Sequence, residues 1–246
     1  MPQRNKALFV RPSEDDGLGA NRYGFYWLQP LIAESLRRRI SVMDLHSFYA
    51  TSEHFSLGLS EHDPLFVFGF GHGDGDTYTG QNYDVILEAC QNDQVLRGRV
   101  VYLLSCHTAT VLGQSMVQKG ALSYIGYQEN FVFATQDPPP ANPLSDGFAR
   151  AFFEPALEVA YALVRGQTTG VAYRRSQVSF NNWVEFWARQ PGPEAPFLIE
   201  ALLWDKNNQV LIGSSAETIA TPTQASQGNL VIPIATIIAA GALLAL

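Results

Sequence analysis

Two stretches of sequence decide the fold, and each leads an apolar run into a reactive side chain. They are FVFGFGHGD at residues 66–74 and VVYLLSCH at residues 100–107. Short apolar runs of this kind are typical of buried strands. In open parallel α/β sheets, functional groups gather at the carboxyl ends of the strands. If the two strands are neighbours, His72 and Cys106 lie at the same edge of the sheet.

That juxtaposition is what a thiol nucleophile and its base require. Cysteine attacks as the thiolate, and an imidazole beside it can take the proton. Acyl transfer also needs donors for the developing oxyanion, and backbone N–H groups are the usual source. Gly73 lets the backbone approach a carbonyl closely, and the amide of Cys106, at the start of a following helix, is the second donor. The sequence therefore predicts His72 and Cys106 as a catalytic pair, with Gly73 and Cys106 as the oxyanion hole.

Outward from these stretches, apolar runs alternate with helix-like segments, which is typical of an α/β domain with a mostly parallel sheet. The Pro-rich stretch 137–143 can be neither helix nor central strand, so we expect an exposed loop there, where a self-cut could fall. Further strands are predicted at 7–10, 40–45 and 122–127, helices at 26–39, 83–96, 108–119, 144–164 and 168–188, and a hairpin at 198–212.

The two strand ends resemble those of the caspase-like cysteine peptidases (clan CD), which include caspases, metacaspases, legumain, separase, gingipains and CHAT domains. In that group one hydrophobic strand ends in His-Gly, as at His72-Gly73, and another in a small residue plus Cys, as at Ser105-Cys106. The segments 120–127 and 164–173 are also similar to gingipain and CHAT proteins. The resemblance covers residues 5 to 213. It implies a three-layer α/β/α caspase-like sandwich that hydrolyses peptide bonds through a thioester.

Substrate preference is less well marked in the sequence. The Gln-Ala-Cys-x-Gly signature of caspases is absent, so the sequence does not support cleavage after Asp. Gingipains, metacaspases and separase prefer Arg or Lys, which needs a carboxylate in the pocket. Asp74, Asp76 and Asp137 are the candidates for that pocket. The resemblance implies no cofactor, although some relatives are activated by calcium, and the acidic loop leaves that open.

Other interpretations of the same residues are weaker. Glycines at 69, 71, 73 and 75 do not have the G-x-G-x-x-G spacing of a dinucleotide-binding loop. His72, Asp74 and Asp76, with His107, could bind a metal ion, but alternate residues on a Gly-rich loop are more often solvated, and we predict no metal site. The net charge is −7 and no long basic run is present, so no nucleic acid is expected.

The chain changes character after Gly213. Residues 214–229 are rich in Ser, Thr, Gln and Ala, like a flexible linker, and residues 230–246 (LVIPIATIIAAGALLAL) are continuously apolar. As a helix the last segment would span about 25 Å, close to the roughly 30 Å of a bilayer core. It lacks the polar face of a final core helix, which is the alternative. We expect a peptidase domain at 1–213, a linker at 214–229 and a transmembrane helix at 230–246.

The sequence therefore predicts a membrane-tethered cysteine endopeptidase that acts on peptide or protein substrates, with a possible preference for a basic residue before the cut. The N-terminal residues show no apolar run of signal-peptide length, so we expect the main domain to be cytoplasmic. The main alternative is a catalytically idle caspase-like scaffold or assembly protein at a membrane. A tail-anchored small-molecule-binding protein is a third interpretation.

Overall fold

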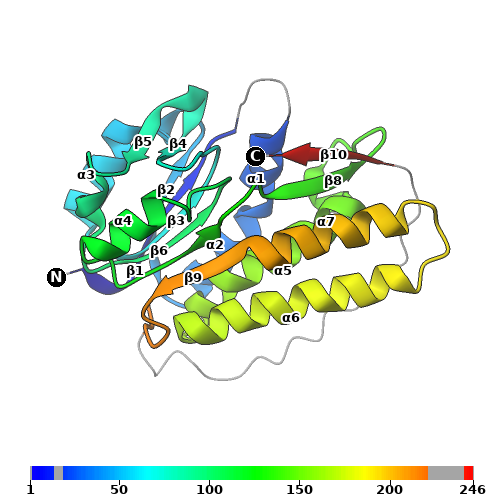
Figure 1. Ribbon diagram of the computed structural model, residues 1–246. Coiled ribbons are helices and arrows are strands. Elements are labelled where there is room, and N and C mark those ends of the chain that lie inside the picture. The colour runs from blue at the N-terminus through cyan, green and yellow to red at the C-terminus, as the bar shows by residue number, and fades with distance from the viewer. Residues whose placement is uncertain (1, 14–18, 221–240, 246) are drawn as a thin grey trace.

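A six-stranded sheet forms the centre of the molecule, in the order β2-β1-β3-β6-β7-β9 (Figure 1). Neighbouring strands are parallel except for β7 and β9. The computed structural model describes residues 2–13, 19–220 and 241–245. The strands of this sheet are β1 (Gln3–Arg11), β2 (Ser41–His46), β3 (Pro64–Phe70), β6 (Val100–Leu104), β7 (Ser123–Tyr127) and β9 (Gln209–Gly213).

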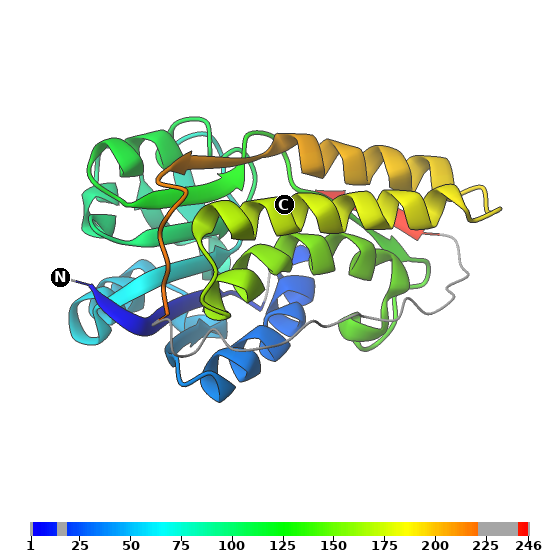
Figure 2. The ribbon, with the colours of Figure 1, turned by 90° about the horizontal axis from the view of Figure 1, so that it is seen from below.

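Helices cover both faces of the sheet, as expected for three layers (Figures 1 and 2). On one face lie α1 (Ala20–Trp27), α2 (Gln29–Arg37) and α5 (Gly147–Val164), with α6 (Thr169–Ala188) and α7 (Ala195–Asn208) packed on α5. On the other face lie α3 (Ser52–His62), α4 (Leu112–Gln118) and the small sheet of β4 (Thr77–Thr79) and β5 (Val85–Glu88). Short 3₁₀ turns occur at Ser47–Tyr49, Gln81–Tyr83, Asp93–Leu96 and Pro143–Ser145.

Strand β3 shows why the apolar runs of the sequence lie at the centre. Phe66, Phe68 and Phe70 belong to the core on the α5 side, and Val67 belongs to the core on the other side. A strand buried on both faces has no polar position, so it appears in the sequence as a continuous apolar run.

Strand β8 (Val132–Gln136), which the sequence did not predict, lies outside the central sheet. It pairs antiparallel with β10 (Gly241–Ala245), and the two form a separate sheet beside α5 and α7 (Figure 1).

Two predicted elements are wrong. The helix predicted at 83–96 is replaced by β5, which pairs with β4, and by a 3₁₀ turn. Tyr83 and Cys90 also have positive φ angles, which an α-helix does not contain. The hairpin predicted at 198–212 is mostly α7. Asp205, placed in the turn by its local sequence, is buried within that helix and accepts a hydrogen bond from Val132 N–H. Tertiary contact overrides turn propensity there.

The C-terminal region also differs from expectation. Within the described residues, no helix is long and apolar enough to span a bilayer. The described part of the predicted membrane helix, Gly241–Ala245, is a strand, because the edge of β8 supplies backbone partners. Residues 214–220 stay attached to the domain, with Asn5 N–H donating to the Ile219 carbonyl at 2.9 Å. The rest of the predicted linker and membrane segment lies outside the described residues, apart from β10.

Candidate active site

The two strands that carry His72 and Cys106 are direct neighbours in the sheet. β3 and β6 are parallel, and their last residues, Phe70 and Leu104, face each other in the register. His72 and Cys106 each follow two residues later, so both lie just beyond the same edge. The juxtaposition that the sequence predicted is therefore present at the level of the backbone.

Gly73 packs directly on the segment that carries the cysteine. A Cβ atom added at Gly73 would collide with Ser105 Oγ, would lie 2.6 Å from Thr108 Cγ2, and would lie 3.0 Å from the carbonyl oxygen of Cys106. A side chain at position 73 would therefore push the two loops apart. The absence of a side chain at Gly73 allows the His-Gly and Ser-Cys segments to meet.

His72 is held by its ring and by its backbone. The imidazole stacks on Tyr83 with ring centroids 5.1 Å apart, and the His72 carbonyl accepts a hydrogen bond from Thr79 N–H at 2.9 Å. Nε2 of His72 is buried and has no hydrogen-bond partner among the described residues. A ring nitrogen without a competing partner is free to exchange a proton with a reacting group.

Cys106 is buried, with 1% of its surface exposed, and it belongs to the core on the α5 side. Its Sγ lies 4.0 Å from the carbonyl oxygen of Phe131, the residue before β8. A substrate could reach this thiol only after a local rearrangement. The buried thiol is the observation that favours an inert core cysteine or an idle domain.

The helix after Cys106 begins later than expected. α4 starts at Leu112, six residues beyond the cysteine, and residues 107–111 form turns. Thr110 Oγ1 and the backbone N–H of Leu112 donate to the carbonyl of Gly75, which holds this turn against the histidine loop. The helix N-terminus is therefore not at the thiol, and the prediction that its dipole favours the thiolate is wrong.

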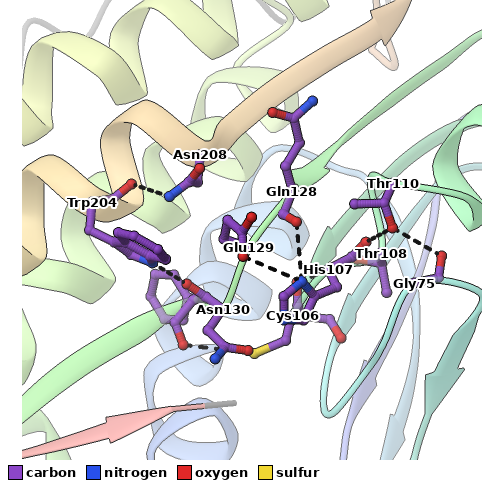
Figure 3. Close-up of polar contacts among 12 residues, drawn as sticks. Gly75, Cys106, His107, Thr108, Thr110, Gln128, Glu129, Asn130, Trp204 and Asn208 are labelled. Atoms are coloured by element: carbon purple, nitrogen blue, oxygen red, sulfur yellow. Dashed lines mark hydrogen bonds and ion pairs between the residues drawn. The ribbon is translucent and has the colours of Figure 1, made fainter.

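His107 joins the cysteine turn to Gln128 and Glu129 (Figure 3). Its backbone N–H donates to the carbonyl of Glu129 at 3.1 Å, and Nδ1 lies 3.2 Å from the carbonyl of Gln128 and 3.7 Å from a carboxylate oxygen of Glu129. The φ angle of His107 is 57°, so the chain turns sharply just after the cysteine. His107 therefore fixes the position of the Cys106 backbone.

Helix α7 positions the segment on the other side of the thiol. Trp204 Nε1 donates to the carbonyl of Asn130 at 2.9 Å (Figure 3). The N–H of Gln128 donates to the carbonyl of Asn208, also at 2.9 Å. Asp205, the residue after Trp204, accepts a hydrogen bond from Val132 N–H, also at 2.9 Å. Burial raises the pKa of Asp205 well above its usual range. Sequence reasoning missed this wall because it assigned residues 198–212 to a hairpin.

The candidate pocket carboxylates do not come together. Asp74 and Asp76 lie on the histidine loop, whereas Asp137 follows β8 at the end away from Phe131. Asp74 accepts hydrogen bonds from Thr77 N–H, from the Thr77 hydroxyl and from Asp76 N–H. Desolvation opposes the charge of Asp74, but these hydrogen bonds outweigh it and lower the pKa. Among the described residues, no three His, Cys, Asp or Glu side chains are placed to hold a metal ion.

A cavity that the sequence did not indicate lies between β8 and α7. Its volume is about 270 Å³, and its walls are mostly apolar with one carboxylate. It is lined by Val132, Phe197, Glu200, Ala201 and Trp204. Phe197, Glu200, Ala201 and Trp204 recur at helical spacing on one face of α7, a pattern concealed by the hairpin assignment.

No protein-family description and no curated protein matches this chain. Among solved structures, the complex of Porphyromonas gingivalis RgpB pro- and mature domains matches with a TM-score of 0.55 and 7% identity, over 88% of this chain and 49% of that chain. The crystal structure of the Arg-specific cysteine proteinase gingipain R matches with a TM-score of 0.54 and 9% identity, over 88% and 48%. This chain spans about half the length of those proteins. At such identity the likeness shows the fold alone, and it confirms the expected caspase-like architecture.

Proposed function

We propose that this chain, which has the fold of the gingipains, is a cysteine peptidase that uses Cys106 as nucleophile and His72 as base. The observation that carries the proposal is the packing of Gly73 on the Ser105–Cys106 segment at the shared edge of β3 and β6. A structural histidine and an inert cysteine need no such contact, whereas a catalytic pair needs both loops at one point.

The reaction has two stages. His72 accepts the thiol proton as Sγ of Cys106 bonds to the substrate carbonyl carbon, and the N–H groups of Gly73 and Cys106 donate to the oxyanion. Collapse breaks the C–N bond, the amine leaves with the proton from His72, and a thioester remains. Water, deprotonated by His72, then attacks the thioester, and the acid product leaves as the thiol is restored.

The cavity between β8 and α7 is a candidate subsite for a basic side chain. Its apolar wall suits a long aliphatic stem, Trp204 and Phe197 offer aromatic faces to a cation, and Glu200 offers a carboxylate. Asp74, Asp76 and Asp137 remain candidates for binding an Arg or Lys side chain of the substrate, and this cavity is a further candidate. It takes the side chain of the peptide residue beside Val132.

The apolar segment 230–246 is also proposed to bind membranes and tether the domain, which would then face the cytosol. The proposal rests on the uncharged sequence of this segment. Because Gly241–Ala245 pairs with β8, insertion of this stretch into a bilayer requires its release from β8. Co-sedimentation with lipid vesicles, compared between the full chain and an Ile237→Lys/Ile238→Lys variant, tests the tether: binding lost in the variant supports it, and equal binding contradicts it.

The peptidase proposal is tested with the full chain and a fluorogenic peptide library, with and without calcium, beside Cys106→Ala and His72→Ala variants. We expect cleavage that both substitutions abolish, with the preferred residue before the cut read from the library. Cleavage that persists in Cys106→Ala contradicts the assignment of the nucleophile.

The burial of Cys106 favours a second candidate, the catalytically idle scaffold. A thiol-reactive peptide probe separates the two functions. A peptidase is labelled selectively at Cys106, whereas an idle domain is labelled no faster there than at the exposed Cys90.

A further inference from the structure

Strand β8 begins beside the thiol and remains outside the central sheet. Phe131, whose carbonyl lies 4.0 Å from Cys106 Sγ, directly precedes Val132, the first residue of β8. Strand β8 therefore starts at the nucleophile and runs away from it, so an extended peptide bound along β8 would have one end at the thiol. Such binding requires an edge of β8 whose backbone N–H and C=O groups are not already bonded to side chains.

One edge of β8 is closed by two buried carboxylates. Val132 N–H donates to Asp205 at 2.9 Å, and Gln136 N–H donates to Asp146 at 3.1 Å. Both carboxylate side chains belong to fully buried residues. Since backbone groups alternate in direction along a strand, the N–H and C=O groups of Phe133 and Thr135 point to the opposite edge. β8 therefore has a single edge available for pairing.

Strand β10 occupies that edge. Ala245 pairs with Val132, Leu243 with Ala134 and Gly241 with Gln136, in antiparallel register. The direction of the β8 backbone groups places the ladder hydrogen bonds at Phe133–Leu244 and Thr135–Ala242, and it leaves the N–H of Leu243 pointing away from β8. The carboxyl end of β10 lies at the Val132 end of β8 (Figure 1). Cys106 lies at this same end, beside Phe131.

We propose that the free edge of β8 is the strand on which an extended peptide substrate binds, and that residues 241–245 of the chain occupy it in cis and hold Cys106 closed. The inference rests on the proposed function for the identity of the displaced ligand. A peptide that runs antiparallel to β8 with its carboxyl end toward Cys106 presents the acyl side of its scissile bond to the thiol. Strand β10 has this polarity, and substrate must displace it through the same backbone hydrogen bonds.

Two proline substitutions at adjacent residues of the full chain distinguish two effects on Cys106. One effect comes from the hydrogen bonds between β10 and β8, and the other comes only from the presence of residues 241–245. Leu244→Pro removes an N–H that donates to β8, whereas Leu243→Pro removes one that points away and leaves the ladder intact. Both variants carry Cys90→Ser, so that Cys106 is the only thiol. The measured quantity is the rate of Cys106 alkylation by iodoacetamide, which requires no peptidase activity.

We expect Leu244→Pro to alkylate Cys106 at least about fivefold faster than the Cys90→Ser parent, and Leu243→Pro to stay within about twofold of it. In the Leu244→Pro chain, the peptide acetyl-Ala-Gly-Ala-Leu-Leu-Ala-amide should restore protection. The same peptide N-methylated at its second Leu should not protect, and N-methylation at its first Leu should be tolerated.

Equal rates in all three chains, or equal acceleration by both proline variants, overturn the proposal, as does failure of the unmodified peptide to protect. The outcome is independent of catalysis. If Leu244→Pro opens the thiol and no peptide is cleaved, cis occupancy stands and the peptidase function fails. If cleavage occurs without any effect of Leu244→Pro, the function stands and cis occupancy fails.

Discussion

At the scale of single residues, Gly73 lies where the histidine loop packs on the cysteine segment, with no room for a side chain. Gly73→Ala places a Cβ against Ser105 Oγ and 3.0 Å from the Cys106 carbonyl, so we expect the two loops to separate. Overpacking of this kind costs about 1–3 kcal/mol in the free energy of unfolding. Urea unfolding measures that cost, and selective probe labelling of Cys106 should fall.

Gly75→Ala is the matched control on the same loop. Its Cβ would meet Thr110 Oγ1 at 3.1 Å and Val111 at 3.8 Å, contacts that a small side-chain shift relieves. We expect Gly75→Ala to keep most of the stability and labelling. If both alanine variants behave alike, Gly73 has no special role in joining the loops.

Asp205 predicts a dependence of stability on pH. Burial raises its folded-state pKa above the unfolded value, so the folded state holds the proton more tightly, and stability falls as pH rises from the unfolded pKa toward the folded one. The free energy of unfolding falls by about 1.4 kcal/mol for each pH unit between the unfolded-state pKa and the folded-state pKa. Asp205→Asn removes the titration and should flatten this part of the profile.

Urea unfolding of the parent and Asp205→Asn at pH 4.5 and pH 8 checks this prediction. The asparagine carbonyl can still accept a hydrogen bond from Val132 N–H. The free energy of unfolding of the variant, relative to that of the parent, should therefore be higher at pH 8 than at pH 4.5. Parallel losses of stability in the two proteins between these pH values would show that Asp205 does not titrate in this way.

At the scale of elements, α7 acts as one wall of the site. Its side chains hold Asn130 and Val132 by hydrogen bonds and line the cavity beside β8. A cavity with two aromatic rings and one carboxylate should prefer cations, and Glu200 supplies the carboxylate. The specificity of the proposed peptidase is therefore expected to change when Glu200 is neutralised.

Glu200→Gln should lower kcat/KM about fivefold for peptides with Lys or Arg beside Val132, and leave peptides with Met or Leu there within about twofold. The control is Glu185→Gln, an exposed carboxylate on α6. A library profile compared across the three proteins measures the change. An unaltered profile in Glu200→Gln assigns the preference to another carboxylate.

At the scale of the whole molecule, Gly241–Ala245 has one observed partner, β8, and one proposed partner, a membrane. β8 pairs with Gly241–Ala245, and a bilayer would take up the same uncharged stretch. The observed pairing and the proposed membrane-bound state exclude each other, so we expect the proposed membrane binding and the exposure of Cys106 to be coupled through this one segment.

Phosphatidylcholine vesicles should therefore speed alkylation of Cys106 in the Cys90→Ser chain. They should have little effect when Leu244→Pro has already released β10. The alkylation rate at increasing lipid concentration measures the coupling. A rate that stays constant while the chain sediments with the vesicles shows that the tail binds lipid without leaving β8.

Most of the central sheet could be predicted from the sequence, and so could the place of the candidate pair. Strands such as β3 and β6 are buried on both faces, so their apolar runs stand out whatever surrounds them. His72 and Cys106 follow those runs directly. Because the carboxyl ends of neighbouring parallel strands lie at the same edge of a sheet, the two residues are expected at one edge. Local sequence alone was enough for these features.

Only the tertiary structure decided the surroundings of the thiol. The pairing of β5 with β4 and the hydrogen bond from Val132 N–H to the buried Asp205 involve residues outside the local segments, so local propensity gave a helix and a hairpin that do not form. Residues 241–245 are apolar enough for a membrane helix. They form a strand because β8 offers an unpaired edge, and hydrogen-bonding partners far away in the chain cannot be read from the segment itself.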